Sequence, residues 1–183
     1  MPATNPTQHL MGFVRDVPDF PKPGIVFKDH TPLLADAEAL ALAVELMAKP
    51  WLNLSDDQRV QYVTGAESRG FIFGTAIARR LNAGFVPVRK PGKLPRAVRQ
   101  VSYDLEYGSD ALEIHEDALP KGSRVLIVDD LLATGGTLKA CCELVVQAQA
   151  EIAGMSILIE LCALNGASHV RDYAMLHTVL KVQ

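Results

Sequence analysis

The chain contains 183 residues, of which 49% are hydrophobic, so its length and composition predict one domain with one sizeable core. Its formal net charge of −3 argues against a general nucleic-acid binder or a membrane-surface binder, because both classes are usually basic. The most apolar segment, residues 152–164, contains Glu160 and is shorter than the roughly 20 residues of a membrane-spanning helix, so no transmembrane segment is expected.

The N-terminal residues and the cysteine spacing match no targeting signal, disulfide framework or zinc site. Residues 1–19 lack an apolar stretch flanked by basic residues and a small-residue cleavage site, so a cytoplasmic location is expected. The cysteines Cys141, Cys142 and Cys162 show no spacing typical of a disulfide framework or a zinc site. They are expected to be buried, reduced thiols.

The first 50 residues predict two helices separated by a loop. A short helix is expected over 7–16, and the prolines within 18–27 exclude regular helix and predict an ordered loop. Asp36 can cap a second helix that runs to about residue 49, where Pro50 stops it.

From residue 60 onward, apolar runs alternate with helical patterns. Such alternation predicts a parallel α/β sheet. The expected strands cover 60–63, 85–88, 125–128, 155–161 and 178–182, and the expected helices cover 71–81 and 138–148.

The segment 90–120 interrupts this alternation because it is polar and charged. Residues 101–107 alternate between apolar and polar, and 108–110 supply a turn, which indicates a surface hairpin or a mobile flap. The chain contains no internal repeat or Ser/Gly-rich linker, so residues 1–183 are expected to form a single unit.

A predicted strand followed by a Gly/Thr turn marks the most informative segment, residues 124–137. Thr134, Gly135, Gly136 and Thr137 would open a helix, whose free N–H groups and partial positive charge suit a phosphate. The lysine of a Walker A loop is absent, which removes the main support for a nucleoside triphosphatase. Asp129 and Asp130 precede the turn, and ribose hydroxyls or Mg²⁺ would let them lie beside a phosphate. The predicted ligand of this segment is therefore a phosphorylated sugar.

Residues 125–137 resemble the phosphoribosyl-diphosphate signature of the type I phosphoribosyltransferases. The resemblance implies a five-stranded parallel sheet flanked by helices, with a small N-terminal hood over about 1–35 and a flexible flap over about 93–117. It also implies Mg²⁺-dependent transfer from phosphoribosyl diphosphate to a nitrogen base. Asp129 and Asp130 would hold the ribose hydroxyls, and the 5′-phosphate would be held by Ala133, Thr134, Gly135, Gly136 and Thr137.

A second strand-to-helix junction lies at residues 62–71. Backbone N–H groups there and the guanidinium of Arg69 could hold one end of a diphosphate, and three cations follow the next predicted strand. The resemblance implies that diphosphate is bound by Glu67, Ser68, Arg69, Arg89, Lys90 and Lys93. It further implies a homodimer in which Arg89 reaches the neighbouring site.

The proposed flap carries a candidate for proton transfer. Glu106 lies between Tyr103 and Tyr107, and closure of the flap could remove it from water and raise its pKa into a useful range. Without the resemblance, an exposed hairpin carboxylate would be the favoured interpretation.

Within the family, the chain resembles the members that act on adenine, in the four blocks 20–29, 68–74, 89–95 with 102–108, and 124–137. The resemblance implies that Val26, Phe27 and Lys28 line an adenine pocket, with Phe27 stacked on the base. Position 28 departs from the pattern, because many relatives carry Arg there; a backbone contact would tolerate Lys, and a guanidinium contact would not. The alternatives are a transferase for hypoxanthine, guanine or xanthine, and a non-catalytic regulator with the same fold.

Overall fold

The computed structural model describes residues 5–104 and 109–183. The chain divides into two compact units, residues 1–46 and 47–183. The expectation of a single domain stays a prediction, and each unit is described by itself. Within the described residues, every helix is too short or too polar to cross a membrane.

The first unit begins with α1 (Pro6–Met11) and a small antiparallel sheet of β1 (Arg15–Pro18) and β2 (Val26–Asp29). Asn5 caps α1, because its side-chain oxygen accepts a hydrogen bond from the Thr7 N–H at 3.1 Å. The expected helix over 7–16 was therefore too long. The last residues of that range, Arg15 and Asp16, pair instead with β2. A local sequence pattern does not show this pairing, because the partner residues are more than ten positions away.

The first unit continues with α2 (Thr31–Ala35) and most of α3 (Ala37–Ala48). Asp36 begins α3 as predicted, since its carboxylate accepts hydrogen bonds from the N–H groups of Glu38 at 3.1 Å and Ala39 at 2.9 Å. Pro50 lies in the single 3-10 turn Lys49–Trp51 that follows the helix.

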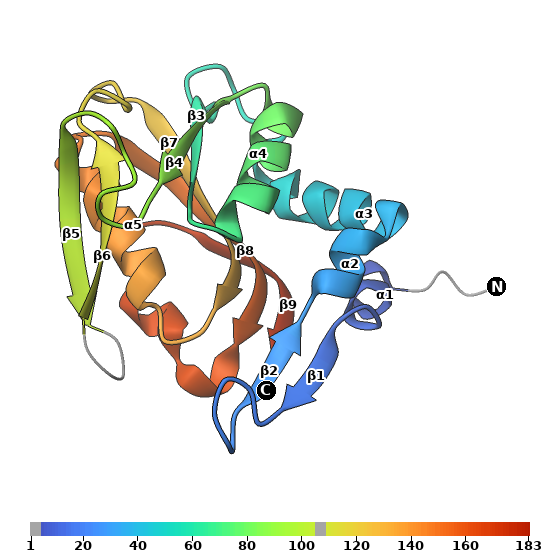
Figure 1. The fold of residues 1–183 in the computed structure, drawn as a ribbon. Coiled ribbons are helices and arrows are strands. Elements are labelled where there is room, and N and C mark those ends of the chain that lie inside the picture. Colours follow the sequence, from blue (N-terminus) through green and yellow to red (C-terminus); the bar gives the residue numbers. More distant parts are fainter. Residues whose placement is uncertain (1–4, 105–108) are drawn as a thin grey trace. The chain divides into compact units, whose positions relative to one another are not determined.

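The second unit contains the predicted five-stranded parallel sheet, in the order β4-β3-β7-β8-β9 (Figure 1). Its middle strands are almost continuously buried, because both faces of the sheet are covered. The strands are β3 (Tyr62–Ala66), β4 (Gly84–Val88), β7 (Arg124–Leu132), β8 (Glu151–Leu161) and β9 (Leu176–Val182).

Two helices connect these strands on opposite faces of the sheet. The first, α4 (Gly70–Leu81), joins β3 to β4, and α5 (Gly136–Gln147) joins β7 to β8. Right-handed crossovers in the two directions place them on opposite faces, as Figure 1 shows. The 3-10 turns Cys162–Leu164 and Gly166–His169 lie between β8 and β9.

The segment expected to be a surface hairpin is a hairpin whose inner face belongs to the core. Its strands are β5 (Val98–Asp104) and β6 (Ser109–His115), and they lie beside α5 (Figure 1). Val101, Leu112 and Ile114 are at most 6% exposed and join the main hydrophobic cluster. The described part of the hairpin is thus anchored by packing, and the expectation of a flexible flap stays a prediction.

Candidate functional site

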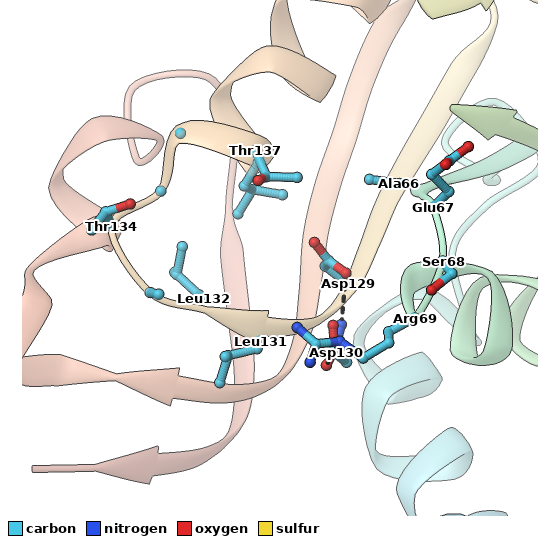
Figure 2. A pocket seen from close by; sticks show the side chains of 14 residues that line it. Ala66, Glu67, Ser68, Arg69, Asp129, Asp130, Leu131, Leu132, Thr134 and Thr137 are labelled. Carbon is cyan, nitrogen blue, oxygen red and sulfur yellow. Dashed lines mark hydrogen bonds and ion pairs between the residues drawn. The ribbon is translucent and has the colours of Figure 1, made fainter. Parts of the chain in front are cut away.

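The strand order of the sheet determines where a ligand can bind. Connections run from β3 outward to β4 and from β7 in the opposite direction to β8, so the order switches between β3 and β7. A cavity of about 210 Å³ opens at the carboxyl ends of these two strands (Figure 2). The residues that line it are Ala66, Glu67, Ser68, Arg69, Asp129, Asp130, Leu131, Leu132, Ala133, Thr134, Gly135, Gly136, Thr137 and Leu138.

One wall is the loop between β7 and α5, where the phosphate is predicted to bind. All five of its predicted residues, 133–137, line the cavity. Gly135 precedes the first turn of α5 with φ at 89°, a left-handed conformation that glycine adopts without strain. Because the N-terminus of α5 opens on the cavity, its free N–H groups and partial positive charge suit an anion there.

A glycine that the sequence analysis missed supports this loop from behind. A Cβ at Gly166 would lie 2.1 Å from the carbonyl oxygen of Ala133, and a Cβ at Gly135 would lie 2.6 Å from the carbonyl oxygen of Gly166. The two backbones can approach this closely only as glycines. The turn signal Asn165-Gly166 was the available clue, but it does not show which loop the turn contacts.

The two acids lie within β7, which continues past them to Leu132. Figure 2 shows Asp129 and Asp130 between the loop of Thr134 and Thr137 and the loop of Glu67. Removal from water and the negative charge of Asp130 raise the pKa of Asp129 well above the ordinary value of an aspartate. Asp130 is 2% exposed, and its carboxylate pairs with the Arg69 Nε at 2.9 Å.

The opposite wall is the loop between β3 and α4, residues 67–69. A Cβ at Gly65 would lie 2.8 Å from the Gly70 carbonyl oxygen and 2.9 Å from that of Val128, so glycine allows the loop to pack against β7. The peptide bond between Glu67 and Ser68 is cis. The structure thus brings Glu67, Ser68 and Arg69 to the same cavity as the phosphate loop.

The three predicted cations after β4 lie outside the cavity lining, and two of them, Arg89 and Lys90, are hydrogen-bonded to Glu67, which lines it. That carboxylate accepts hydrogen bonds from the Arg89 Nε and, at 3.1 Å, from the Lys90 N–H. Partial burial alone would raise the pKa of Glu67, but these two hydrogen bonds hold it below the ordinary value. Lys90 also pairs with Asp110 at 3.0 Å, and Lys93 is exposed in the turn that follows.

The predicted hairpin residues are only partly described. The Thr137 hydroxyl donates to the Tyr103 oxygen at 3.5 Å, so Tyr103 lies beside the phosphate loop. Burial is the main reason why the pKa of Tyr103 is raised, so it is a neutral phenol at physiological pH. Glu106 and Tyr107 lie outside the described residues, and their roles stay predictions.

The predicted base-binding residues all lie on β2 in the first unit. Phe27 packs edge-to-face with Phe20, with ring centroids 5.3 Å apart. Lys28 forms a cross-strand ion pair with Asp16 at 2.6 Å. Val26 is 47% exposed.

Metal binding by protein side chains alone is not indicated in the part of the chain that is described, where no three His, Cys, Asp or Glu residues cluster suitably. Asp129 and Asp130 nevertheless offer carboxylates at the cavity. Mg²⁺ commonly binds through one or two carboxylates, with phosphates and water as its other ligands. The residues therefore fit an ion that is held mainly by a phosphorylated substrate.

The contact behind the phosphate loop yields a first prediction. Gly166→Ala should destabilise the protein by about 1–3 kcal/mol, because the new methyl group collides with backbone atoms that cannot rotate away. It should also weaken binding of ribose 5-phosphate, measured by calorimetry. Gly12→Ala is the control, since its methyl group would lie 3.3 Å from its nearest neighbour. Unchanged binding in Gly166→Ala would show that this contact does not shape the loop.

The raised pKa of Asp129 yields a second prediction. At a pH above the raised pKa, Asp129→Asn should stabilise the ligand-free protein by on the order of 1 kcal/mol, because it removes a charge that is buried and that Asp130 repels. The gain should be largest at alkaline pH and should shrink as the pH falls through the raised pKa, since the aspartate is then protonated. Thermal unfolding across pH measures this, with the exposed Asp56→Asn as control. A gain that does not vary with pH would contradict the electrostatic cause.

Comparisons with known proteins agree with this geometry. The model of the phosphoribosyl transferase domain matches residues 32–182. An adenine phosphoribosyltransferase of Rhodopirellula baltica is 58% identical over 178 residues, which cover 96% of this chain and 84% of that protein.

Solved structures show the same likeness. The crystal structure of adenine phosphoribosyltransferase from Rhodothermus marinus is 48% identical, with a TM-score of 0.89 over 97% of this chain and 98% of that one. The Saccharomyces cerevisiae enzyme, complexed with an imino-altritol bisphosphate and adenine, is 37% identical, with a TM-score of 0.88 over 96% and 98% of the two chains. The fold, the two loops that line one cavity and these likenesses together show that the chain belongs to the adenine phosphoribosyltransferase family.

Proposed function

We propose that the protein transfers the 5-phosphoribosyl group of phosphoribosyl diphosphate to adenine, forming AMP and diphosphate. The observation that carries this proposal is that the two loops predicted to bind anions, 67–69 and 133–137, line the same cavity. Phosphoribosyl diphosphate has a phosphate at one end, a diphosphate at the other and two hydroxyls between them. The loop 133–137, the loop 67–69 and the acids Asp129 and Asp130 supply a partner for each part.

Transfer forms a bond between C1′ of the ribose and a purine nitrogen and breaks the bond from C1′ to the diphosphate oxygen. Positive charge develops on the ribose as the diphosphate leaves. Arg69, Arg89 and Lys90 would balance the charge of the leaving group, and Asp129 and Asp130 would hold the ribose hydroxyls. Mg²⁺ on the diphosphate would add positive charge to the leaving group.

The incoming purine nitrogen must lose a proton, and we assign its acceptance to Glu106. The base itself is assigned to Val26, Phe27 and Lys28. The pairing of the Lys28 ammonium with Asp16 supports a base contact through the backbone, which would explain why Lys is tolerated where many relatives have Arg. The complex of the yeast relative with adenine supports the choice of base. The homodimer, with Arg89 reaching the neighbouring site, belongs to the same proposal.

The reaction is tested by incubating the protein with phosphoribosyl diphosphate, Mg²⁺ and one base at a time, followed by chromatography of nucleotide and diphosphate. AMP from adenine is the expected product, with little nucleotide from hypoxanthine, guanine or xanthine. Their polar groups at position 6 differ from the amino group of adenine, so a site built for one should reject the other. Nucleotide formed from another base would identify that base as the substrate. Binding of phosphoribosyl diphosphate without formation of any nucleotide would indicate a regulator.

The proton transfer is tested by Glu106→Ala, with Glu116→Ala as an exposed control. Turnover should fall by about 10²–10⁴-fold in Glu106→Ala, the usual contribution of a general base. Calorimetry should show that phosphoribosyl diphosphate still binds with an affinity close to that of the unaltered protein. Equal turnover in the two variants would remove Glu106 from the mechanism.

A further inference from the structure

Carboxylates hold the cations to which the proposed function assigns diphosphate binding. Arg69 pairs with Asp130, Arg89 with Glu67, and Lys90 with Asp110. The first two carboxylates line the cavity and have roles in the proposed function. Asp110 lies on β6, outside the cavity lining, and the proposed reaction gives it no task.

Asp110 has two further hydrogen-bond partners besides Lys90. Its Oδ1 accepts a hydrogen bond from the Ala111 N–H at 2.9 Å, and its Oδ2 accepts one from the Tyr103 hydroxyl at 3.5 Å. Tyr103 is its cross-strand partner in the hairpin. The Asp110 side chain is 22% exposed, whereas that of Lys90 is 53% exposed. The fixed partner of this ion pair is therefore the carboxylate, and the mobile partner is the long lysine side chain.

The ion pair strongly favours the charged form of both groups. The hydrogen bond between them raises the pKa of Lys90 and lowers that of Asp110. An incoming diphosphate must therefore share the ammonium with Asp110 or take it from Asp110, and the carboxylate charge opposes that of the ligand.

We propose that Asp110 is a positioning residue that acts as the resident counter-ion of Lys90, holding the ammonium at the hairpin in the empty site and competing with diphosphate for it. The inference rests on the proposed function, in which Lys90 contacts diphosphate. This competition makes the site bind diphosphate more weakly than the cations alone would. The effect applies both to the diphosphate group of the substrate and to free diphosphate as the product. Asp110 thus favours product release at the expense of substrate affinity.

The test is Asp110→Asn, which keeps an oxygen for the Ala111 N–H and removes the charge that holds Lys90. Calorimetry with inorganic diphosphate and with phosphoribosyl diphosphate, each with Mg²⁺, should show binding about three- to tenfold tighter than in the unaltered protein. The KM for phosphoribosyl diphosphate should fall, and kcat should not rise. Asp117→Asn is the matched control, because it removes the same charge from an exposed pair with Arg96 just beyond the hairpin.

A second variant pair tests whether Asp110 acts through Lys90. In a Lys90→Gln background, Asp110→Asn should change diphosphate affinity by less than twofold. An equal gain in both backgrounds would show direct repulsion and overturn the counter-ion role, as would unchanged or weaker binding in Asp110→Asn alone. If the unaltered protein binds neither ligand, the proposed function itself fails and the inference fails with it.

Discussion

The close backbone approach at the end of β3 is the constraint on which the rest of the site depends. Gly65 allows the loop after β3 to pack against β7, and Gly70 lets α4 begin beside Asp129, where a Cβ would lie 3.0 Å from the carboxylate. Larger residues would separate the two strand ends, and the loops would then open on different spaces. The strands β3 and β7 are neighbours in the sheet, and the strand order switches between them. The two loops that follow these strands therefore start side by side.

The repulsion between the two adjacent acids of the site is only partly compensated. Asp129 and Asp130 are adjacent acids, and only Asp130 has the Arg69 guanidinium at 2.9 Å. Asp129 retains the raised pKa that follows from burial beside another acid. Ribose hydroxyls would give Asp129 further donors besides the Asp130 N–H, which donates to its Oδ1 at 3.0 Å. The site is therefore electrostatically strained without a ligand, as expected where stability is lost in favour of binding.

The sequence predicted the parallel sheet and the positions of the two strand-to-helix loops, 67–69 and 133–137, because their signals are local. Strands buried on both faces appear as apolar runs, and the loops require Gly and Thr at fixed places after them. The strand β1, the support from Gly166 and the Lys90–Asp110 pair depend on contacts between distant residues. From the sequence pattern alone, Lys90 and Asp110 would be interpreted as exposed charged residues. Only the folded structure shows that the two side chains form an ion pair.

The residues assigned to the base and those assigned to the sugar and phosphates lie in different units of the chain. Every residue assigned to ribose, phosphate and diphosphate lies in the second unit, where the packed sheet, Gly65 and Gly166 fix the loops. The residues assigned to the base lie on β2 of the first unit, in a two-stranded sheet whose backbone is set by the β1 pairing. Under the proposed function, a different base would require new groups on β2, whereas the residues assigned to the sugar and the phosphates could stay unchanged. The Lys28 ammonium pairs with Asp16 within that small sheet, so under the proposed function Lys in place of Arg would leave the loops of the second unit unaltered.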